Sequence, residues 1–587
     1  MGTVVGLHEF RERPMIRVAT CQYRTGNDVD ANLDKLLSMI DLAAAGGAAL
    51  LAAPEFGNHT SLFESPEHAW THAITQSGPY MTAVQDRARR HGIHVVFNAT
   101  RRGESRPNAF ISNFLVGPDG ALIGRDDKQV LMSGESRFLN RSDHTGRVFD
   151  TSIGRIAMMS CLDGVPPETA RVLALAGAQI IINTHNSCAL DEPFGHIPAR
   201  AAENAVFVIA AGKVGPVCVD EMVEPFAERL GLPEHTLTAW GENPILGREG
   251  EVLAQLPHLE EGVVSADINP GESDDKRWED GDLLADRRPG LYGDLLRAPV
   301  AQVGTPAPGF DAAIVQMRSD RPARSNIERG LDLVADAAAN GARLVVLPEL
   351  FSFTSADLID DLPAALSRAE DAEAQLAALC REEEIFVACS LPTDDAGPRH
   401  TGLLIDDAGT RAGTYHQSHV TASDRRWCLP GDSLPVWDTK LGMIAMMVGY
   451  DAVFPEVASS LALRGAEILV HPTTWRFEWE PGLVLPERAS ENRLTILSAA
   501  RWDSPIRRGG IISALGRSQP LRAADLNPIW PVEAPHDREG HVHATVYPER
   551  SRDKDLLGFD LLAGRRPELY ESLVAHFTPI HRGGEPS

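Results

Sequence analysis

Positive charge is scarce in this chain. Its 587 residues hold 55 lysines and arginines against 82 aspartates and glutamates, which gives a formal net charge of -27. Nucleic acids and anionic membranes both attract cationic surfaces, so we expect neither as a partner. Lysine is especially rare and occurs only at Lys35, Lys128, Lys213, Lys276, Lys440 and Lys554. Because the chain uses arginine for ordinary surface charge, each lysine is a candidate for a specific role.

Long apolar runs and paired cysteines are also missing. No stretch approaches the roughly 18 uninterrupted apolar residues of a transmembrane helix. The segment Met1–Gly6 has no charged region leading into a long apolar run, so we expect no secretory signal and a cytoplasmic location. The seven cysteines are odd in number and lack paired spacing, which argues against a disulfide framework or a zinc site. We expect no metal and no cofactor.

One sequence pattern is present twice. The run Ile156–Asp163 (IAMMSCLD) returns as Ile444–Asp451 (IAMMVGYD). Four further pairs follow the same order along the chain: Ala49–Phe56 with Leu344–Phe351, Ala176–Asn183 with Arg464–His471, Arg200–Asn204 with Arg488–Asn492, and two Arg-Arg-Pro-x-Leu-Tyr motifs that end at Tyr292 and Tyr570. An ordered series of this kind indicates a tandem duplication.

The repeat sets the expected domain organisation. We predict an N-terminal extension over 1–14, a first domain over 15–298, a linker over 299–307 that is rich in Pro, Gly and Ala, a second domain over 308–578, and a C-terminal tail over 579–587. Each copy alternates short β-rich runs with helical stretches and contains strand pairs joined by tight turns. This mixture predicts an α/β fold with a mixed sheet and helices outside.

Cys161 is the first candidate for chemistry. It follows an apolar strand and precedes a helix that begins near Pro166. A thiol on such a strand-to-helix turn is exposed and close to backbone N–H groups, as a nucleophile requires. A free cysteine is more often a small buried apolar residue, so Cys161 alone does not establish a function.

Glu55, Lys128 and Glu135 are the other candidates. Glu55 ends a buried strand, where partial desolvation would raise the pKa of its carboxyl group towards that of a useful base. Lys128 follows a strand, where an ammonium could hold an oxyanion and favour a thiolate. Glu135 lies seven residues further on and could orient Lys128 or a water molecule. Glu55 and Lys128 also have structural alternatives, a loop-bonding carboxylate for Glu55 and a surface cation for Lys128.

The combination resembles the nitrilase superfamily of carbon–nitrogen hydrolases, in both copies and over nearly the whole chain. The resemblance implies two tandem nitrilase-like αββα sandwich domains. It also implies a catalytic triad of Glu55, Lys128 and Cys161, with Glu135 as an auxiliary glutamate. The backbone N–H of Leu162 would share the oxyanion with Lys128. Members of this family usually pair through helices, so the two copies would form a pseudo-dimer within one chain, with further homo-oligomerisation open.

The second copy departs from the pattern at the reactive positions. Glu349 is kept, but Gln417 stands at the lysine position, Asp424 at that of the auxiliary glutamate, and Gly449 at that of the cysteine. Glycine carries no nucleophile and glutamine supplies no ammonium. The neighbouring Cys428 lies on another segment. We therefore expect one active site per chain, in the first copy.

The substrate is predicted only as a class. Asp163 stands two residues after Cys161, as in amide- and carbamoyl-cleaving members, so we expect hydrolysis of a small linear amide or N-carbamoyl compound through a Cys161 thioester. Asp163, His185 and Asn186 are candidate substrate contacts, and His185 is equally compatible with a structural imidazole. A nitrilase, an acyltransferase that uses the same thioester, and a ligand-binding module with an idle triad are the alternatives.

Overall fold

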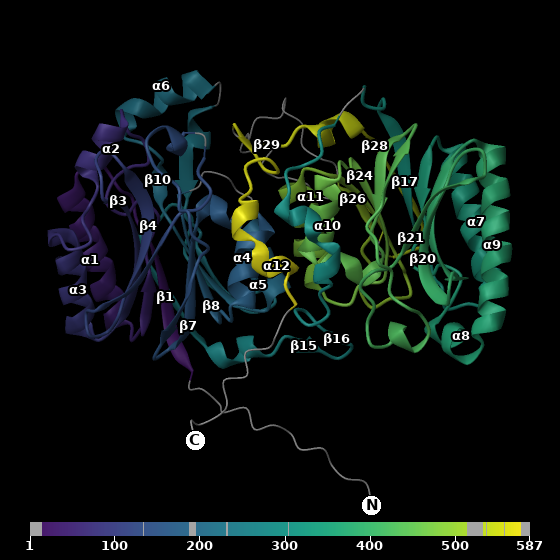
Figure 1. The fold of residues 1–587 in the computed structure, drawn as a ribbon, viewed down its shortest axis with the longest axis horizontal. Helices are drawn as coiled ribbons and strands as arrows, with labels where there is room; N and C mark the ends of the chain where they lie inside the picture. The colour runs from purple at the N-terminus through teal and green to yellow at the C-terminus, as the bar shows by residue number, and fades with distance from the viewer. Residues whose placement is uncertain are drawn as a thin grey trace, which may run out of the picture.

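The chain folds into two αββα sandwiches that lie side by side (Figure 1). The computed structural model describes residues 15–132, 134–186, 195–230, 233–302, 305–512, 532–535, 537–556 and 558–576. The fold class predicted from the sequence and its family resemblance is confirmed in both copies.

Each sandwich contains two six-stranded sheets. In copy one the first sheet has the order β14 (Gly262–Ile268), β1 (Ile16–Gln22), β2 (Leu50–Ala52), β3 (His94–Arg102), β4 (Ala109–Val116), β5 (Leu122–Asp127). The second has the order β13 (Val252–Gln255), β12 (Pro244–Leu246), β9 (Phe207–Gly212), β8 (Ile180–His185), β7 (Gly154–Ser160), β6 (Val148–Thr151). Both sheets are mixed, with parallel strands in the centre and antiparallel strands at the edges.

Copy two repeats this arrangement strand for strand. Its first sheet has the order β28 (Gly540–Val546), β17 (Phe310–Gln316), β18 (Leu344–Val346), β19 (Phe386–Asp394), β20 (Pro398–Ile405), β21 (Arg411–His416). Its second has the order β27 (Val532–Glu533), β26 (Gly510–Ile512), β25 (Thr495–Ala500), β24 (Ile468–Thr473), β23 (Gly442–Met446), β22 (Val436–Thr439).

Apolar side chains hold the layers together. Val18 and Val96 of the first sheet pack against Ile156 and Ile182 of the second in one buried cluster between the sheets. Strands that are buried on both faces need continuous apolar runs, which explains why β7 and β8 show no alternation. Helices cover the outer faces: α1 (Val29–Ala45), α3 (Pro79–His91), α4 (Pro167–Leu175) and α5 (Ile197–Asn204) in copy one, and α7 (Ala323–Ala339), α9 (Leu362–Glu383), α10 (Pro455–Leu463) and α11 (Leu485–Asn492) in copy two.

Shorter elements connect these layers or cap their ends. The helices are α2 (Pro66–His72), α6 (Asp220–Leu230), α8 (Ser355–Asp360) and α12 (Glu571–Val574), and the small hairpins pair β10 (Val214–Pro216) with β11 (Thr238–Trp240), β15 (Arg277–Trp278) with β16 (Gly281–Asp282), and β29 (Asp555–Leu556) with β30 (Phe559–Asp560). Within the described ranges, no helix combines the length and the hydropathy that crossing a membrane requires.

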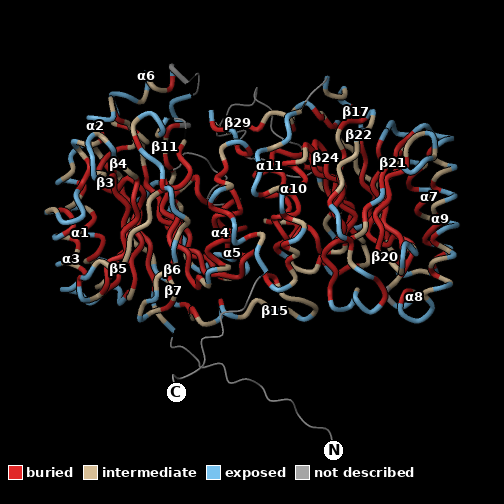
Figure 2. The backbone as a smooth tube through the Cα atoms, in the orientation of Figure 1, coloured by how far each residue is buried: buried red, intermediate tan, exposed pale blue. Residues whose placement is uncertain are grey.

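The two sandwiches meet through α4 and α5 of copy one and α10 and α11 of copy two (Figure 1). Every residue of α5 is buried, whereas α1 on the outside buries only one face, a contrast visible in Figure 2. A helix without a solvent-facing stripe must be covered on all sides. Here the partner copy supplies that cover, and the chain forms the predicted intramolecular pair.

A buried ion-pair cluster crosses this interface with two-fold pseudosymmetry. Arg200 pairs with Glu203 in its own copy at 2.7 Å and with Glu491 across the interface at 2.6 Å. Arg488 pairs with Glu491 in its own copy at 2.7 Å and with Glu203 across the interface. These residues belong to the two Arg-Ala-x-Glu-Asn motifs, so the duplication provides the self-complementary surface of an isologous contact.

The C-terminal segment of each copy crosses to the other. Arg287 of copy one forms a 2.7 Å ion pair with Glu456 of α10, and Arg565 of copy two forms a 2.7 Å ion pair with Glu168 of α4. The predicted limits at residues 298 and 308 mark the sequence repeat. The structure does not divide at these limits, because the C-terminal segment of each copy packs on the sandwich of the other.

Candidate active site

The candidate triad comes from the ends of three strands of copy one. Glu55 follows β2, Lys128 follows β5 directly, and Cys161 follows β7 directly. The ends of β2 and β5 lie in one sheet, where Lys128 Nζ donates to Glu55 Oε1 at 2.9 Å across 73 residues of chain, whereas β7 belongs to the second sheet. Glu55 and Lys128 are each 1% exposed. Glu55 and Lys128 are therefore inside the sandwich, whereas Cys161 is partly exposed.

Lys128 bridges two carboxylates. Its Nζ also donates to Oε1 of Glu135 at 2.9 Å. Burial by itself lowers the pKa of Lys128, but the charges of Glu135 and Glu55, with a smaller contribution from Cys161, outweigh burial and hold this pKa well above its usual value. The two carboxylates thus favour the charged form of Lys128, which also interacts electrostatically with Cys161.

Cys161 sits on a strained turn. Its φ of 47° lies in the left-handed region, where a side chain costs roughly 1–2 kcal/mol. The backbone N–H of Cys161 donates to Asn183 Oδ1 at 3.2 Å, which anchors the turn to β8. Strained residues of this kind occur at functional sites and persist because surrounding contacts fix them. The sharp turn that the sequence predicts for Cys161 is present.

Asp163 lies beneath the turn and is occupied by backbone donors. Its carboxylate accepts from the N–H of Gln129 at 3.0 Å, of Val130 at 2.7 Å and of Ser160 at 3.1 Å. It therefore ties the loop after Lys128 to the turn that carries Cys161. This geometry favours a positioning role over the substrate contact that we predicted for Asp163.

A buried polar network behind the site was not predicted. Asn98 Oδ1 accepts from the N–H of Phe56 at 3.0 Å, and Asn98 Nδ2 donates to Asn113 Oδ1 at 2.9 Å. Asn113 Nδ2 donates in turn to Ser160 Oγ at 2.9 Å, and Thr184 Oγ1 donates to Asn113 Oδ1 at 2.8 Å. This network joins the residue after Glu55 to the residue before Cys161. The available signal was polar residues inside otherwise apolar strands.

The other predicted contacts have different environments. His185, at the end of β8, is 3% exposed, and a Cβ on Gly212 would lie 2.3 Å from its Cε1. Burial lowers the pKa of His185 to about 4, against a weaker opposing hydrogen bond with Asn243. This neutral, packed imidazole matches the structural interpretation. Asn186 is half-buried beside the end of β8, and Leu162 is 2% exposed.

In copy two, each reactive position has its expected replacement. Gln417 follows β21 as Lys128 follows β5, and Gly449 begins the turn after β23 with a φ of 46°. A cation is still present there, because Arg476 Nη2 lies 3.8 Å from Glu349 Oε1 and 3.7 Å from Asp424 Oδ2. Arg476 comes from the segment after β24. It therefore supplies a positive charge near Glu349, but from a different segment than the one that carries Lys128 in copy one.

The polar network is also replaced in copy two. Ser390 replaces only one of its hydrogen bonds: Ser390 Oγ accepts from the N–H of Leu350 at 2.9 Å, as Asn98 accepts from Phe56 in copy one. Gly402 has no side chain, and a Cβ there would lie 2.1 Å from the sulfur of Met446. Val448, which precedes Gly449, is apolar. The second copy has thus filled with apolar atoms a space that the first copy uses for hydrogen bonds.

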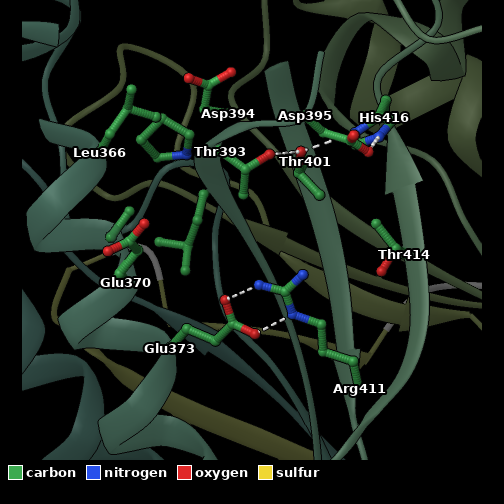
Figure 3. Close-up of a pocket in the computed structure, with 13 residues that line it drawn as sticks. Leu366, Glu370, Glu373, Thr393, Asp394, Asp395, Thr401, Arg411, Thr414 and His416 are labelled. Atoms are coloured by element: carbon green, nitrogen blue, oxygen red, sulfur yellow. Dashed lines mark hydrogen bonds and ion pairs between the residues drawn. The ribbon is translucent and has the colours of Figure 1, made fainter. Parts of the chain in front are cut away.

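A surface cavity of about 380 Å³ lies in copy two between α9 and strands β19–β21 (Figure 3). Glu373 faces Arg411 across it, and Asp395 faces His416. No triad residue lines this cavity, so it is separate from the candidate active site. No group of three or more His, Cys, Asp or Glu in the described ranges is arranged to hold a metal ion.

Several known proteins are similar in sequence to about one third to one half of this chain. A nitrilase from Pyrococcus abyssi is 31% identical over 282 residues, which span 47% of this chain and 99% of the relative. The omega-amidase NIT2 of Homo sapiens is 26% identical, over 32% of this chain and 74% of the relative. A citrullinase from Francisella tularensis is 25% identical, over 45% of this chain and 98% of the relative.

Among solved structures, an amidase from Nesterenkonia sp. AN1 is 22% identical, with a TM-score of 0.37, and covers 45% of this chain and 96% of that chain. The family model described as carbon-nitrogen hydrolase matches residues 17–277 and again residues 311–519. The two matches cover more than half of the chain and fall one on each sandwich. The chain therefore belongs to the carbon–nitrogen hydrolase family, as a tandem duplication of its domain.

Proposed function

We propose that this protein is an amidohydrolase that cleaves a non-peptide C–N bond of a small linear amide or N-carbamoyl compound. Cys161 would be the nucleophile, Glu55 the general base and Lys128 the oxyanion-stabilising cation. Relatives named omega-amidase and citrullinase support an amide or carbamoyl substrate, since citrulline ends in a carbamoyl group. The strongest single support is the buried Lys128, which bridges Glu55 and Glu135 beside the Cys161 turn.

The first half-reaction forms a thioester. Glu55 takes the proton of the Cys161 thiol, and the thiolate adds to the substrate carbonyl carbon. The oxyanion of the tetrahedral intermediate accepts hydrogen bonds from Lys128 and from the backbone N–H of Leu162. Glu55 returns its proton to the nitrogen as the C–N bond breaks, which releases ammonia or an amine.

The second half-reaction regenerates the enzyme. Glu55 takes a proton from water, which adds to the thioester carbon, and the same donors hold the second oxyanion. The C–S bond then breaks, the acid leaves, and the sulfur regains its proton from Glu55. Glu135 keeps Lys128 in place throughout, since both carboxylates share one ammonium.

Only the first copy would perform this reaction. Gly449 offers no sulfur, and Gln417 no ammonium. The absence of polar side chains at Gly402 and Val448 agrees with a scaffold that no longer has to position a nucleophile. At most one acyl group per chain would then be bound covalently, as a thioester on Cys161.

Ammonia release from a panel of amides, N-carbamoyl compounds and nitriles tests the proposal. We expect the wild type to act on amides or carbamoyl compounds and Cys161→Ala to be inactive, while Cys428→Ala serves as the matched thiol control. Undiminished turnover in Cys161→Ala would refute the assignment. The nitrile arm is needed because a relative is named nitrilase, and amine added to the reaction separates hydrolysis from acyl transfer.

A further inference from the structure

The repeated Arg-Arg-Pro-x-Leu-Tyr motif places an arginine of copy two against the active centre of copy one. Arg566 is 3% exposed although it carries a charge. Its Nη1 donates to the backbone carbonyl of Gln129 at 2.7 Å and to that of Ser142 at 2.8 Å. Gln129 directly follows Lys128. A guanidinium from the far end of the chain therefore contacts the loop that carries the catalytic lysine.

The loop after Lys128 is held from both sides. The N–H of Gln129 donates to Asp163 at 3.0 Å, and its carbonyl accepts from Arg566. The N–H of Ser142 donates to the carbonyl of Lys128 at 2.8 Å, and the carbonyl of Ser142 accepts from Arg566. One guanidinium thus binds carbonyls of the two backbone segments that meet at Lys128, while Asp163 binds N–H groups of the same loop.

The same tail also packs against the nucleophile turn. Phe559 and Leu561 join Val130, Leu162 and Val165 in one apolar cluster. Leu162 carries the backbone N–H that we assign to the oxyanion, and its side chain is 2% exposed. Two parts of the proposed oxyanion site, the lysine loop and the turn after Cys161, therefore rest on residues of the other copy.

Pseudosymmetry provides a matched position in copy one. Arg288 Nη1 donates to the carbonyl of Ser418 at 2.8 Å and to that of Gly431 at 2.9 Å. Ser418 follows Gln417 as Gln129 follows Lys128. Arg288 makes the same contacts at the same kind of interface, but it holds the loop of the copy that lacks the cysteine and the lysine.

We propose that residues 558–570 of the second copy are a required part of the first copy's active centre, with Arg566 as a positioning residue for Lys128. This inference rests on the proposed function. It assigns a reason for keeping the second copy, because the tail of copy two sets the geometry of chemistry that copy two no longer performs. A displacement of about 1 Å at a catalytic group can lower a rate roughly 100-fold, and supporting contacts of this kind set that precision.

The test compares Arg566→Met with Arg288→Met in the full-length protein. We expect kcat on the best amide substrate to fall about 10- to 100-fold in Arg566→Met, with KM changed little because the Arg566 guanidinium is engaged with Glu568 and with the carbonyls of Gln129 and Ser142. Arg288→Met should keep kcat within about twofold of the wild type. Arg566→Lys should recover part of the loss, since an ammonium can still reach one carbonyl. Alkylation of Cys161 by iodoacetamide across pH gives a second readout, and its rate profile should shift only in the Arg566 variants.

The outcomes separate this inference from the proposed function. Equal losses in the two methionine variants would show a shared effect on the interface and overturn the positioning role, as would full activity in Arg566→Met. If Arg566→Met does not fold, Arg566→Lys against Arg288→Lys decides by the same criteria. Turnover that survives Cys161→Ala would instead remove the proposed function itself.

Discussion

Replacing Lys128 by methionine should lower both activity and stability. The burial of its two ion-pair partners, Glu55 and Glu135, indicates which of them contributes more to the loss of stability. The substitution keeps most of the side-chain volume but removes the cation between Glu55 and Glu135. Leaving a buried carboxylate without its partner typically costs 3–5 kcal/mol, an order-of-magnitude figure. For one sandwich of roughly 280 residues, with an unfolding entropy of about 2.1 cal/mol/K per residue, that corresponds to a fall in Tm of about 5–8 °C. Turnover should fall roughly 100-fold or more, because an oxyanion donor is lost with the charge.

The burial of the two carboxylates predicts which second substitution restores stability. The side chain of Glu55 is 1% exposed and that of Glu135 is 11% exposed. Glu135 can regain some water when Lys128 is removed, whereas Glu55 cannot. We therefore expect Lys128→Met/Glu55→Gln to recover more stability than Lys128→Met/Glu135→Gln, and neither to recover turnover.

Thermal unfolding and ammonia release measure the two effects. Lys440→Met is the control, because the Lys440 side chain is 51% exposed and its ion pair with Asp407 lies at the surface, where such pairs contribute about 0–1 kcal/mol. Unfolding of Lys128→Met at the wild-type temperature would refute this prediction, as would a greater recovery of stability in Lys128→Met/Glu135→Gln than in Lys128→Met/Glu55→Gln.

Two further predictions concern the second copy. Gly449→Cys should not create a second active site and should lower stability by about 1–2 kcal/mol. The reason is that the φ of Gly449 is 46° and a Cβ there would lie 2.5 Å from Glu349 Oε1. Ammonia release by Cys161→Ala/Gly449→Cys at the wild-type rate would contradict this prediction. Burial lowers the pKa of Lys554 to about 7, well below the value of an unfolded lysine. The unfolded chain therefore binds more protons than the folded one between about pH 7 and 10, so the contribution of Lys554 to stability rises with pH over that range, by at most about 1.4 kcal/mol per pH unit. Urea unfolding at pH 7, 8 and 9 should show a shallower rise in Lys554→Met than in the wild type, and equal slopes would argue against a buried, largely neutral lysine. Lys276→Met is the matched variant, since burial likewise lowers the pKa of Lys276 to about 7 and both lysines donate to the last carbonyls of the equivalent helices α5 and α11.

The sequence was most informative where chemistry is local. Cys161 and Gly449 stand at the same strand-to-helix turn, and both have a positive φ. The residue type at such a turn can be compared directly between the copies. Residues 417 and 449 could therefore be matched to the lysine and cysteine positions without a structure.

Where a side chain finds its partner could not be predicted in the same way. Asp163 looked like a substrate contact because it stands close to Cys161 in sequence, yet three backbone N–H groups occupy it. Asn98 and Asn113 carried no motif, because a polar residue in a strand gives no indication of which neighbour will satisfy it. The packing of two sheets determines these pairings, since a buried polar group must find a hydrogen-bond partner wherever the fold provides one.

The sequence by itself determined that the chain is a duplication, that each copy is a carbon–nitrogen hydrolase sandwich, and that only one copy holds a cysteine and a lysine at the reactive positions. Tertiary structure decided that Lys128 meets Glu55 across 73 residues and that Arg566 meets Gln129 across 437. Side-chain chemistry and turn conformation are local properties of the chain, whereas these contacts exist only after β2 and β5 have joined one sheet and the two copies have exchanged their tails.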